Sequence, residues 1–300
     1  MHSKSSYCVV CSRFVVCLWV VAASQTDARV AVRDHFDGKG LPAGIVEQLR
    51  SIDNEDFGED SCKIVPKDVQ LTRHSSRSGF HRDIHTSVSV LLDQSHHCTS
   101  CHLLLIERLP GGLYVDLYQS AAAVDFGGPQ ILAFEEIDLE KPAYLSAGHT
   151  ILVYPSSSPQ IIPQGREVVV NFTTEMPIHL RYHRPSAEPD AHSAHVSLPS
   201  PYALIRCTGA SHIGTQTTAD DDADGLPVYK APCSGTSNTN CLWRLLPQSP
   251  RENHELHFQV PVGQQSHTLL VTVVTILATI AGTLAVLVTM FRSSTKAKPD

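Results

Sequence analysis

The longest uninterrupted hydrophobic stretch of the chain lies near its C-terminus, at residues 269–291. These 23 residues contain no charge and no proline, and their polarity is limited to threonines and one glycine. As a helix they would rise roughly 34 Å, which exceeds the hydrocarbon core of a bilayer, about 30 Å thick. A buried helix of a soluble domain would instead show polar positions along one face. The pattern therefore predicts a transmembrane helix over residues 269–291.

A shorter hydrophobic run lies at residues 14–23, close to the N-terminus. Lys4 precedes it and small residues follow at positions 22–24, which is typical of a cleaved secretory signal peptide. Arg13 interrupts the hydrophobic residues before this run, which disfavours a second span. We predict a signal peptide over residues 1–23, with an uncleaved anchor as the alternative.

The two flanks of the predicted span differ in charge. Residues 253–268 contain no Lys or Arg, whereas Arg292, Lys296 and Lys298 follow the span closely. The positive-inside bias places the tail, residues 292–300, in the cytosol and the preceding domain on the lumenal or extracellular side. A GPI-attachment signal normally finishes with apolar residues, so the basic end favours a retained anchor.

Between the two hydrophobic ends, short runs alternate hydrophobic and polar residues, which is the pattern of half-buried strands. Residues 84–90 show it most clearly, and residues 101–109 are a further candidate. Pro110-Gly111-Gly112 then predicts a hairpin turn into a strand over residues 113–118. Further strands are predicted at residues 144–154, 167–174, 178–182 and 256–262. Because helical periodicity is nearly absent, we expect an all-β lumenal domain, sandwich- or barrel-like, followed by a single C-terminal transmembrane helix.

The predicted domain has a loose start and two polar interruptions. Residues 24–61 are expected to form a variable, partly disordered segment with a brief helical pattern at 43–52. The β-rich domain then covers residues 62–268. It is interrupted at residues 185–201, rich in Pro, Ser, Ala and His, and by a polar insert at 209–225 with an acidic cluster. A D-x-D sequence in this cluster is compatible with a divalent cation, but its low-complexity surroundings favour a solvated loop.

Charge and cysteine content limit the partners and the redox compartment that are compatible with this domain. The chain carries 23 basic and 30 acidic residues, and its acidic balance argues against nucleic acid or an anionic membrane surface as partner. Three of the nine cysteines leave with the leader, and the even number that remains suits disulfides in an oxidising compartment. The candidate disulfide cysteines are Cys62, Cys98, Cys101, Cys207, Cys233 and Cys241. Their pairing stays open, although we expect disulfides on both sides of the acidic loop.

The sequence HCTSCH at residues 97–102 is the sharpest chemical cluster. Structural disulfides or a local thiol pair are the favoured interpretation. A redox C-x-x-C usually opens a helix, and a zinc site needs a second ligand pair, but both stay as alternatives. Motifs of hydrolases, zincins, phosphate loops and dinucleotide sites do not occur in the sequence. The residues therefore predict no catalytic residue, no metal site and no cofactor.

Five short motifs precede the predicted span in a defined order: GFHRD (79–83), LPGGLYVDLY (109–118), PAYLS (142–146), PIHLRYHRPS (177–186) and VPVG…HT (260–268). In these motifs, and over roughly residues 62–292, the chain resembles the PIG-X family. The resemblance implies a non-catalytic, stabilising subunit in the endoplasmic reticulum membrane. Its implied partner is a multi-span, PIG-M-like catalytic subunit that adds the first mannose to the GPI-anchor precursor.

The resemblance and the topology together suggest sites. Basic and aromatic side chains suit an interface, so the candidate partner contacts are Arg181, Tyr182, His183 and Arg184. A polar strand end that folds back on its own domain is the alternative. Asn171 begins the single N-x-S/T sequon and is the candidate glycan acceptor.

The role of the cytosolic tail and the function of the chain each have an alternative interpretation. Lys296 and Lys298 form a K-x-K-x-x arrangement that looks like an endoplasmic reticulum retrieval signal, with ordinary stop-transfer charge as the alternative. The span implies contact with membrane lipid. Without the resemblance, a type I adhesion or receptor-like ectodomain without enzymatic activity has the same topology. A lumenal glycosidase or transferase would need a catalytic motif, and the sequence offers none.

Overall fold

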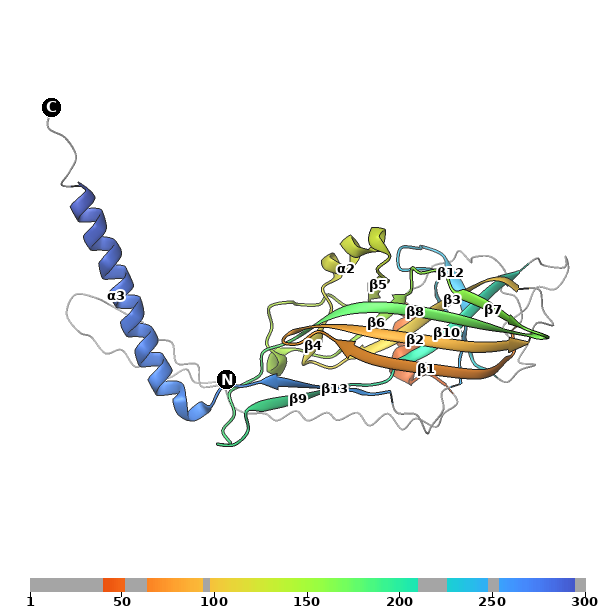
Figure 1. The fold of residues 1–300 in the computed structure, drawn as a ribbon, viewed down its shortest axis with the longest axis horizontal. Helices are drawn as coiled ribbons and strands as arrows, with labels where there is room; N and C mark the ends of the chain where they lie inside the picture. Colours follow the sequence, from red (N-terminus) through yellow and green to blue (C-terminus); the bar gives the residue numbers. More distant parts are fainter. Residues whose placement is uncertain (1–39, 52–63, 94–97, 210–225, 248–253, 295–300) are drawn as a thin grey trace, which may run out of the picture. The chain divides into compact units, whose positions relative to one another are not determined.

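The computed structural model describes residues 40–51, 64–93, 98–209, 226–247 and 254–294. The predicted signal peptide, residues 210–225 of the acidic insert, and the tail with Lys296 and Lys298 lie outside these residues. Most of the described chain forms antiparallel strands in two large sheets (Figure 1). The predicted all-β fold class, followed by one apolar C-terminal helix, is confirmed.

The first sheet has five strands. Its order is β1 (Pro66–Ser76), β2 (His81–Asp93), β8 (Glu167–Leu180) and β4 (Leu113–Tyr114), and β7 (Gln160–Gln164) also pairs with β8. Along β2, every second residue from Ile84 to Leu92 is buried, and the residues between them face outwards. The strand predicted from this alternation is confirmed.

β8 joins two runs that the sequence pattern separates at Pro177. Proline has no N–H to donate to a neighbouring strand. It is therefore tolerated in a strand only where no neighbouring strand would accept that hydrogen bond. The N–H of Leu180 donates to Phe80 on the β2 side, at 2.8 Å, so alternate residues direct their backbone groups towards β2. Pro177 directs its nitrogen to the other edge, between the parts of β8 that pair with β7 and β4. No described strand pairs there, and the strand continues through the proline.

The second sheet has six strands and is covered on both faces. Its order is β11 (Val228–Pro232), β12 (Asn240–Leu245), β10 (Tyr202–Gly209), β3 (Cys98–Leu109), β6 (His149–Tyr154) and β5 (Gln130–Ala133). One face packs against the first sheet, with residues such as Ile84, Phe172 and Leu105 in a shared core. Covering on both faces explains why the residues from 103 to 106 in β3 are all hydrophobic and buried, without alternation.

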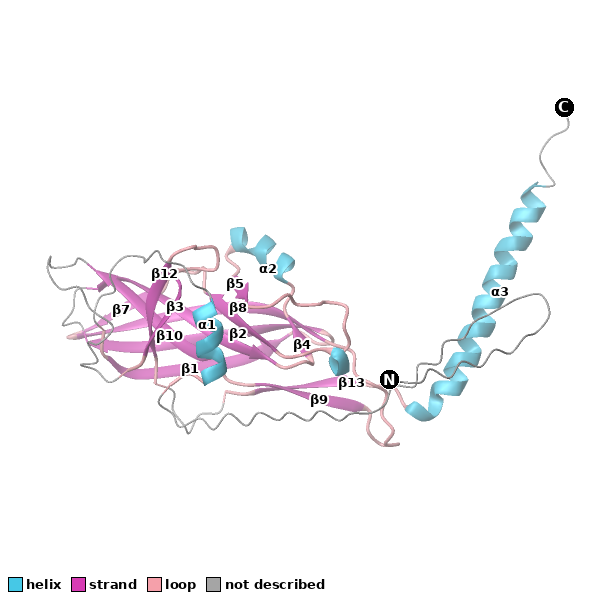
Figure 2. Cartoon of the chain, turned by 180° about the vertical axis from the view of Figure 1, so that it is seen from behind, coloured by secondary structure: helices cyan, strands magenta, loops and turns pink. Residues whose placement is uncertain are grey.

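The other face of the second sheet packs against α1 (Ala43–Ser51), as Figure 2 shows. Leu41, Ile45 and Leu49 contribute to this second core, which contains the fully buried Trp243. The folded domain therefore begins before residue 62, the boundary expected from the sequence. The brief helical pattern of the N-terminal segment is a packed helix because its hydrophobic side chains have a sheet face to cover.

The predicted hairpin across Pro110-Gly111-Gly112 is wrong, since β3 and β4 belong to different sheets. The N–H of Leu113 donates to the carbonyl of Pro110, at 3.0 Å, in a turn that carries the chain from one sheet to the other. The carboxylate of Asp116 then accepts the N–H groups of Tyr118 and Gln119 and caps α2 (Leu117–Ala123). Only two residues after the turn are strand, because the cap starts a helix.

The segment 185–201 is not an interruption of the core. It contains β9 (Ser193–Leu198), which pairs with β13 (Leu256–Pro261) in a separate two-stranded sheet. Val196 and Leu198 are buried in the main core. The alternating pattern is short and lies within a Pro- and Ser-rich composition, which hides it in the sequence.

A buried ion pair joins the two large sheets. Arg73 Nη2 in β1 lies 2.8 Å from Glu107 Oε1 in β3, and at most 1% of either side chain is exposed. Arg73 also donates to Thr86 Oγ1 and to the carbonyl of Pro199. Burial raises the pKa of the Glu107 carboxyl, and attraction to Arg73 opposes this shift. The pair therefore matters most through the cost of leaving either charge alone in the core.

Two disulfides occur in the described domain. Cys101–Cys207 joins neighbouring strands β3 and β10, and Cys233–Cys241 closes the connection between β11 and β12. Cys98 is also disulfide-bonded, whereas Cys62 lies outside the described residues. Since Cys101 pairs with Cys207, the C-x-x-C sequence is not a local thiol pair. The disulfides lie on both sides of residues 210–225 in the chain.

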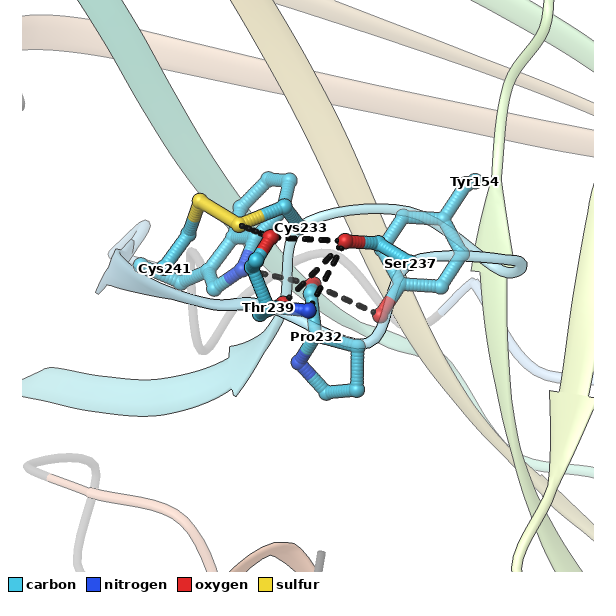
Figure 3. The surroundings of a disulfide bond; sticks show 7 residues. Tyr154, Pro232, Cys233, Ser237, Thr239 and Cys241 are labelled. Atoms are coloured by element: carbon cyan, nitrogen blue, oxygen red, sulfur yellow. Dashed lines mark hydrogen bonds between the residues drawn. A yellow bond between two sulfur atoms is a disulfide. The ribbon is translucent and has the colours of Figure 1, made fainter. Parts of the chain in front are cut away.

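The Cys233–Cys241 connection is held by polar contacts as well (Figure 3). The N–H of Thr239 donates to Ser237 Oγ at 3.0 Å, and Thr239 Oγ1 donates to Cys233 Sγ at 3.4 Å. Tyr154 Oη donates to the carbonyl of Pro232 at 3.0 Å, and Trp243 Nε1 donates to the same oxygen. This turn is thereby fixed to the second core.

α3 (Thr268–Ser294) is the one helix in the described parts of the chain that is long and apolar enough to cross a membrane. Its candidate span runs from Gln265 to Arg292. Thr272, Thr275, Thr279 and Thr283 each donate their hydroxyl to the carbonyl four residues earlier. The helix therefore satisfies these polar groups itself, as a lipid environment requires.

Candidate functional site

The five sequence motifs lie far apart in the chain and meet at one end of the first sheet. We call this assembly the motif cluster, and it consists of residues 79–83, 109–118, 142–146, 177–186 and 260–268. The segment 177–186, at the end of β8, is its centre because it contacts each of the other four segments.

The first contact joins the β1–β2 turn to the end of β8. Phe80 accepts the N–H of Leu180, and the rings of Phe80 and Tyr182 lie with their centroids 4.8 Å apart. The turn itself is fixed by Arg77, which has a φ of 63° and lies 2.5 Å from the buried carboxylate of Asp83. Phe80 is thus held against Tyr182 by a turn with its own ion pair.

The second contact explains the two motif glycines. The carbonyl of Gly112 accepts the N–H of Arg181 at 2.9 Å, and the guanidinium of Arg181 lies 4.5 Å above the ring of Tyr114. A Cβ atom at Gly111 would lie 2.6 Å from the carbonyl oxygen of Ser146. The turn therefore needs glycine because the PAYLS segment passes directly over it.

The third contact brings the PAYLS segment to the end of β8. Ala143, the first residue of the short 3₁₀ turn η2 (Ala143–Leu145), donates its N–H to the carbonyl of Tyr182 at 2.9 Å. The guanidinium of Arg184 lies 4.4 Å from the centroid of the Tyr144 ring. Cation and aromatic ring are therefore neighbours on the surface.

The fourth contact connects the cluster to the candidate span. Ser186 donates its N–H to Gly263 and accepts the N–H of Gln265, each at 2.8 Å. Gln265 begins both the 3₁₀ turn η3 (Gln265–His267) and the candidate span. The end of the segment 177–186 is therefore hydrogen-bonded to the residue at which the candidate span begins.

Of the four predicted contact residues, Arg181 does not lie on the surface. Its residue exposure is 2%, its Nη1 donates to the carbonyl of Lys141 at 2.6 Å, and burial lowers its pKa. Arg181 supports the cluster from beneath, between Tyr114 and the PAYLS segment. Tyr182 is 72% exposed, Arg184 is exposed and His183 is half-buried.

Three histidines border this cluster, and the pKa of each is lowered. Burial is the main cause for His149, His179 and His183, and Arg181 lowers the pKa of His149 further. His179 also stacks on Tyr114 with ring centroids 4.9 Å apart. Burial therefore favours the neutral form of each histidine, and Arg184 contributes exposed positive charge to the cluster.

Asn171, the candidate glycan acceptor, lies at the opposite end of β8. It is half-buried on the outward side of the strand, paired with Ser89 of β2 and with Gln160 of β7. A cleft of about 410 Å³ lies further along the same side and includes Thr72, Ser87 and Thr173 in its lining. The acceptor side chain therefore lies beside short hydroxylic residues.

Sequence reasoning missed Phe80, Tyr114, Tyr144 and Leu145 as members of the site. All four lie in motifs that the sequence displays, but nothing local shows that these motifs meet. Exposed aromatic residues next to arginine, held in fixed positions by backbone hydrogen bonds, are the features of a recognition surface. Within the described ranges, no group of three or more His, Cys, Asp or Glu residues is arranged to hold a metal ion.

A β domain of two large sheets, joined by a hydrogen-bonded connection to one candidate span among the described residues, fits a single-pass membrane protein. The family model described as PIG-X / PBN1 matches residues 77–291, which is most of the chain. The chain belongs to this family, as its motifs predict.

Three relatives carry the name "GPI alpha-1,4-mannosyltransferase I, stabilizing subunit". The Rattus norvegicus protein is 27% identical over 259 residues, covering 83% of this chain and 92% of its own. The Homo sapiens protein is 28% identical over 235 residues, covering 75% of this chain and 81% of its own. The Mus musculus protein is 27% identical and covers 75% of this chain and 82% of its own. No solved structure matches the chain.

Proposed function

We propose that this chain is the stabilising, non-catalytic subunit of the endoplasmic reticulum mannosyltransferase that adds the first mannose to the GPI-anchor precursor. The observation that carries this proposal is the motif cluster, in a chain whose relatives are named as stabilising subunits. The partner is a multi-span, PIG-M-like catalytic subunit. A lipid-linked donor and acceptor need a site among several helices, and this chain offers one candidate span in its described residues.

The lumenal contact with that partner is made by Tyr182, His183 and Arg184. The ring of Phe80 packs against that of Tyr182, and Tyr144 lies under Arg184, so both exposed side chains are ordered before binding. Ordered aromatic and arginine side chains lose little conformational entropy in a complex, which is why such residues are often interface hot spots.

A second contact is made within the membrane by α3. Thr272, Thr275, Thr279 and Gly282 recur at intervals of three or four residues and so share one helical face. Larger residues such as Leu277 and Leu284 lie on the opposite face. With Ala278 and Ala285 at its border, the small face allows another helix to approach closely.

The proposed topology follows the domain boundaries expected from the sequence. Residues 1–23 are a cleaved signal peptide, the lumenal domain extends to residue 268, residues 269–291 span the membrane, and residues 292–300 are cytosolic. Membrane lipid surrounds the span, and Lys296 and Lys298 return the protein to the endoplasmic reticulum. Two disulfides support an oxidising lumenal environment for the domain.

The topology is tested with the glycan and a C-terminal tag. Asn171 is expected to carry a high-mannose glycan that endoglycosidase H removes. A tag at the C-terminus is expected to be digested by protease added to intact microsomes. Complex glycans at Asn171 would favour a cell-surface adhesion or receptor-like protein, and a protected tag would reverse the orientation.

The function is tested in cells that lack this chain. Wild-type chain should restore the steady-state level of the mannosyltransferase and the GPI-anchored proteins at the cell surface. The double variant Tyr182→Ala/Arg184→Ala should bind the mannosyltransferase about 30-fold more weakly and lower its steady-state level, since two hot-spot contacts of about 1 kcal/mol each are lost.

The matched control is Ile161→Ala/Ile162→Ala, which removes exposed hydrophobic residues from β7 at the opposite end of β8. This control should restore the mannosyltransferase fully. The proposal is wrong if the mannosyltransferase reaches full abundance and activity in cells without this chain.

A further inference from the structure

The turn η2 places two hydrophobic side chains on the surface of the motif cluster. Tyr144 is 50% exposed and Leu145 is 62% exposed. The turn is fixed by the hydrogen bond from Ala143 to Tyr182, by a hydrogen bond from Leu145 to Pro142, and by the close passage of Ser146 over Gly111. These side chains are therefore presented by a rigid turn.

Backbone connections hold this turn near the start of the candidate span. Ser186 is hydrogen-bonded to Gly263 and to Gln265, the first residue of that span. Arg184 is two residues from Ser186, which is at most about 7 Å of extended chain. The guanidinium of Arg184 lies 4.4 Å from the centroid of the Tyr144 ring. A helix that crosses the bilayer therefore brings Tyr144 to the region where the chain enters the membrane.

The chemistry of these three side chains matches that region. Tyrosine has an apolar ring and a polar hydroxyl, and it is enriched at the level of the lipid headgroups. Leucine gains free energy when it leaves water for the upper acyl chains. The guanidinium of Arg184 has donors that match the geometry of a headgroup phosphate.

We propose that Tyr144 and Leu145 insert into the lumenal membrane interface, with Arg184 at the level of the headgroup phosphates. This contact attaches the domain to the bilayer at a second point beside α3 and fixes its orientation above the membrane. The proposal rests on α3 as a membrane span and on the lumenal placement of the domain, and not on the mannosyltransferase.

The test uses the full mature chain, reconstituted alone in phosphatidylcholine nanodiscs, with tryptophan as the reporter. Tyr144→Trp is compared with Ile161→Trp, whose parent side chain is 48% exposed. Ile161 pairs with Val170 of β8, ten residues from Leu180, so it lies about 33 Å along the strand from Leu180. Trp243 is fully buried and gives a constant background, which the unsubstituted chain measures.

Phosphatidylcholine brominated on the upper acyl carbons quenches tryptophan at the interface. Interfacial side chains lie about 5–10 Å into the headgroup and acyl boundary, so the added tryptophan of Tyr144→Trp should lose about half of its emission. The added tryptophan of Ile161→Trp should keep its emission. Equal quenching of the two variants, or no quenching of Tyr144→Trp, would overturn the proposal.

A second variant tests insertion without disturbing the fold. Leu145→Asp in the Tyr144→Trp background should abolish the quenching, because a carboxylate resists transfer into the interface. The emission of Trp243 and the unfolding temperature should stay unchanged, since Leu145 is exposed. Quenching that persists in this variant would also contradict the proposal. Because the partner is absent from the nanodisc, this result is independent of the cellular assay of the proposed function.

Discussion

The two ends of β8 present different surfaces. Near its start, Asn171, Thr173 and Glu175 face outwards beside polar residues of β2, which is the next strand of the same sheet. Near its end, His179 and the exposed Tyr182 lie against aromatic rings. The first surface is built from two adjacent strands of one sheet, β2 and β8. The second is built from five segments that are distant in sequence.

The difference shows where the chain has little freedom to vary. An outward strand face needs only polar side chains to stay soluble. In the motif cluster, the Gly111 position has no room for a Cβ atom, and the backbone groups of Gly112, Tyr182 and Ser186 all have partners in another segment. This difference supports the proposal that the cluster serves recognition and that the polar end carries the glycan.

The largest expected effect is a loss of stability of the whole domain, which should disrupt the surfaces at both ends of β8. Glu107→Gln leaves Arg73 buried without a counter-charge, so urea unfolding should show a loss of about 3–5 kcal/mol. The control Glu167→Gln removes an ion pair with Lys67 that has the same N–O distance, 2.8 Å, but is partly exposed. That control should cost at most about 1 kcal/mol. Equal midpoints for the two variants would show that the buried pair does not hold the sheets together.

The next largest effect is expected at the motif cluster alone, without a change at the polar end of β8. Gly111→Ala places a Cβ atom against the carbonyl of Ser146, so thermal unfolding should show a loss of about 1–3 kcal/mol and the mannosyltransferase level should fall. Gly263→Ala is the matched control, because it lies in another motif but has open space around it. It should behave like wild type. If Gly111→Ala is equally stable, the close packing of the cluster is not required.

A smaller effect is expected at the polar end. Asn171→Gln should remove the endoglycosidase H-sensitive glycan, while the free energy of unfolding changes by no more than about 0.5 kcal/mol, since the side chain faces outwards. The mannosyltransferase level should stay near that of wild type. A loss as large as that of Tyr182→Ala/Arg184→Ala would mean that the polar end also contacts the partner.

The smallest effect concerns pH. Burial lowers the pKa of His149 and His183, so the folded state favours their neutral forms. Their contribution to stability is complete above the unfolded-state pKa, about 6.5, and is lost as pH falls towards the lowered folded-state pKa. The melting temperature should therefore drop on acidification. His183→Gln should reduce this drop.

Local pattern predicted the parts of the fold that depend on neighbouring residues. The alternation from Ile84 to Val90 is a strand, and residues 256–262 correspond to β13. The turn at Pro110 was also recognisable, but the strand that follows it pairs in another sheet. Strand order depends on contacts between distant residues, and periodicity carries no information about them.

The same limit applies to the site. The motifs single out residues 177–186, and the sequence predicts four of these residues as partner contacts. Their sequence does not show that Arg181 is buried beneath Lys141 while Tyr182 is exposed. Nor does it show that Tyr144 lies under Arg184. Exposure and ring contacts follow from how the segments pack, which is a property of the whole domain.

The sequence by itself determined the candidate membrane span, the all-β class and the family of this protein. A stretch of more than twenty apolar residues has few other uses, and a period of two suits a strand with one buried face. Tertiary structure alone decided that α1 belongs to the folded domain, that β3 and β4 lie in different sheets, and that five motifs meet beside the span. The physical reason is that burial and hydrogen bonding between distant segments are chosen by the free energy of the whole domain, whereas periodicity reports only neighbours along the chain.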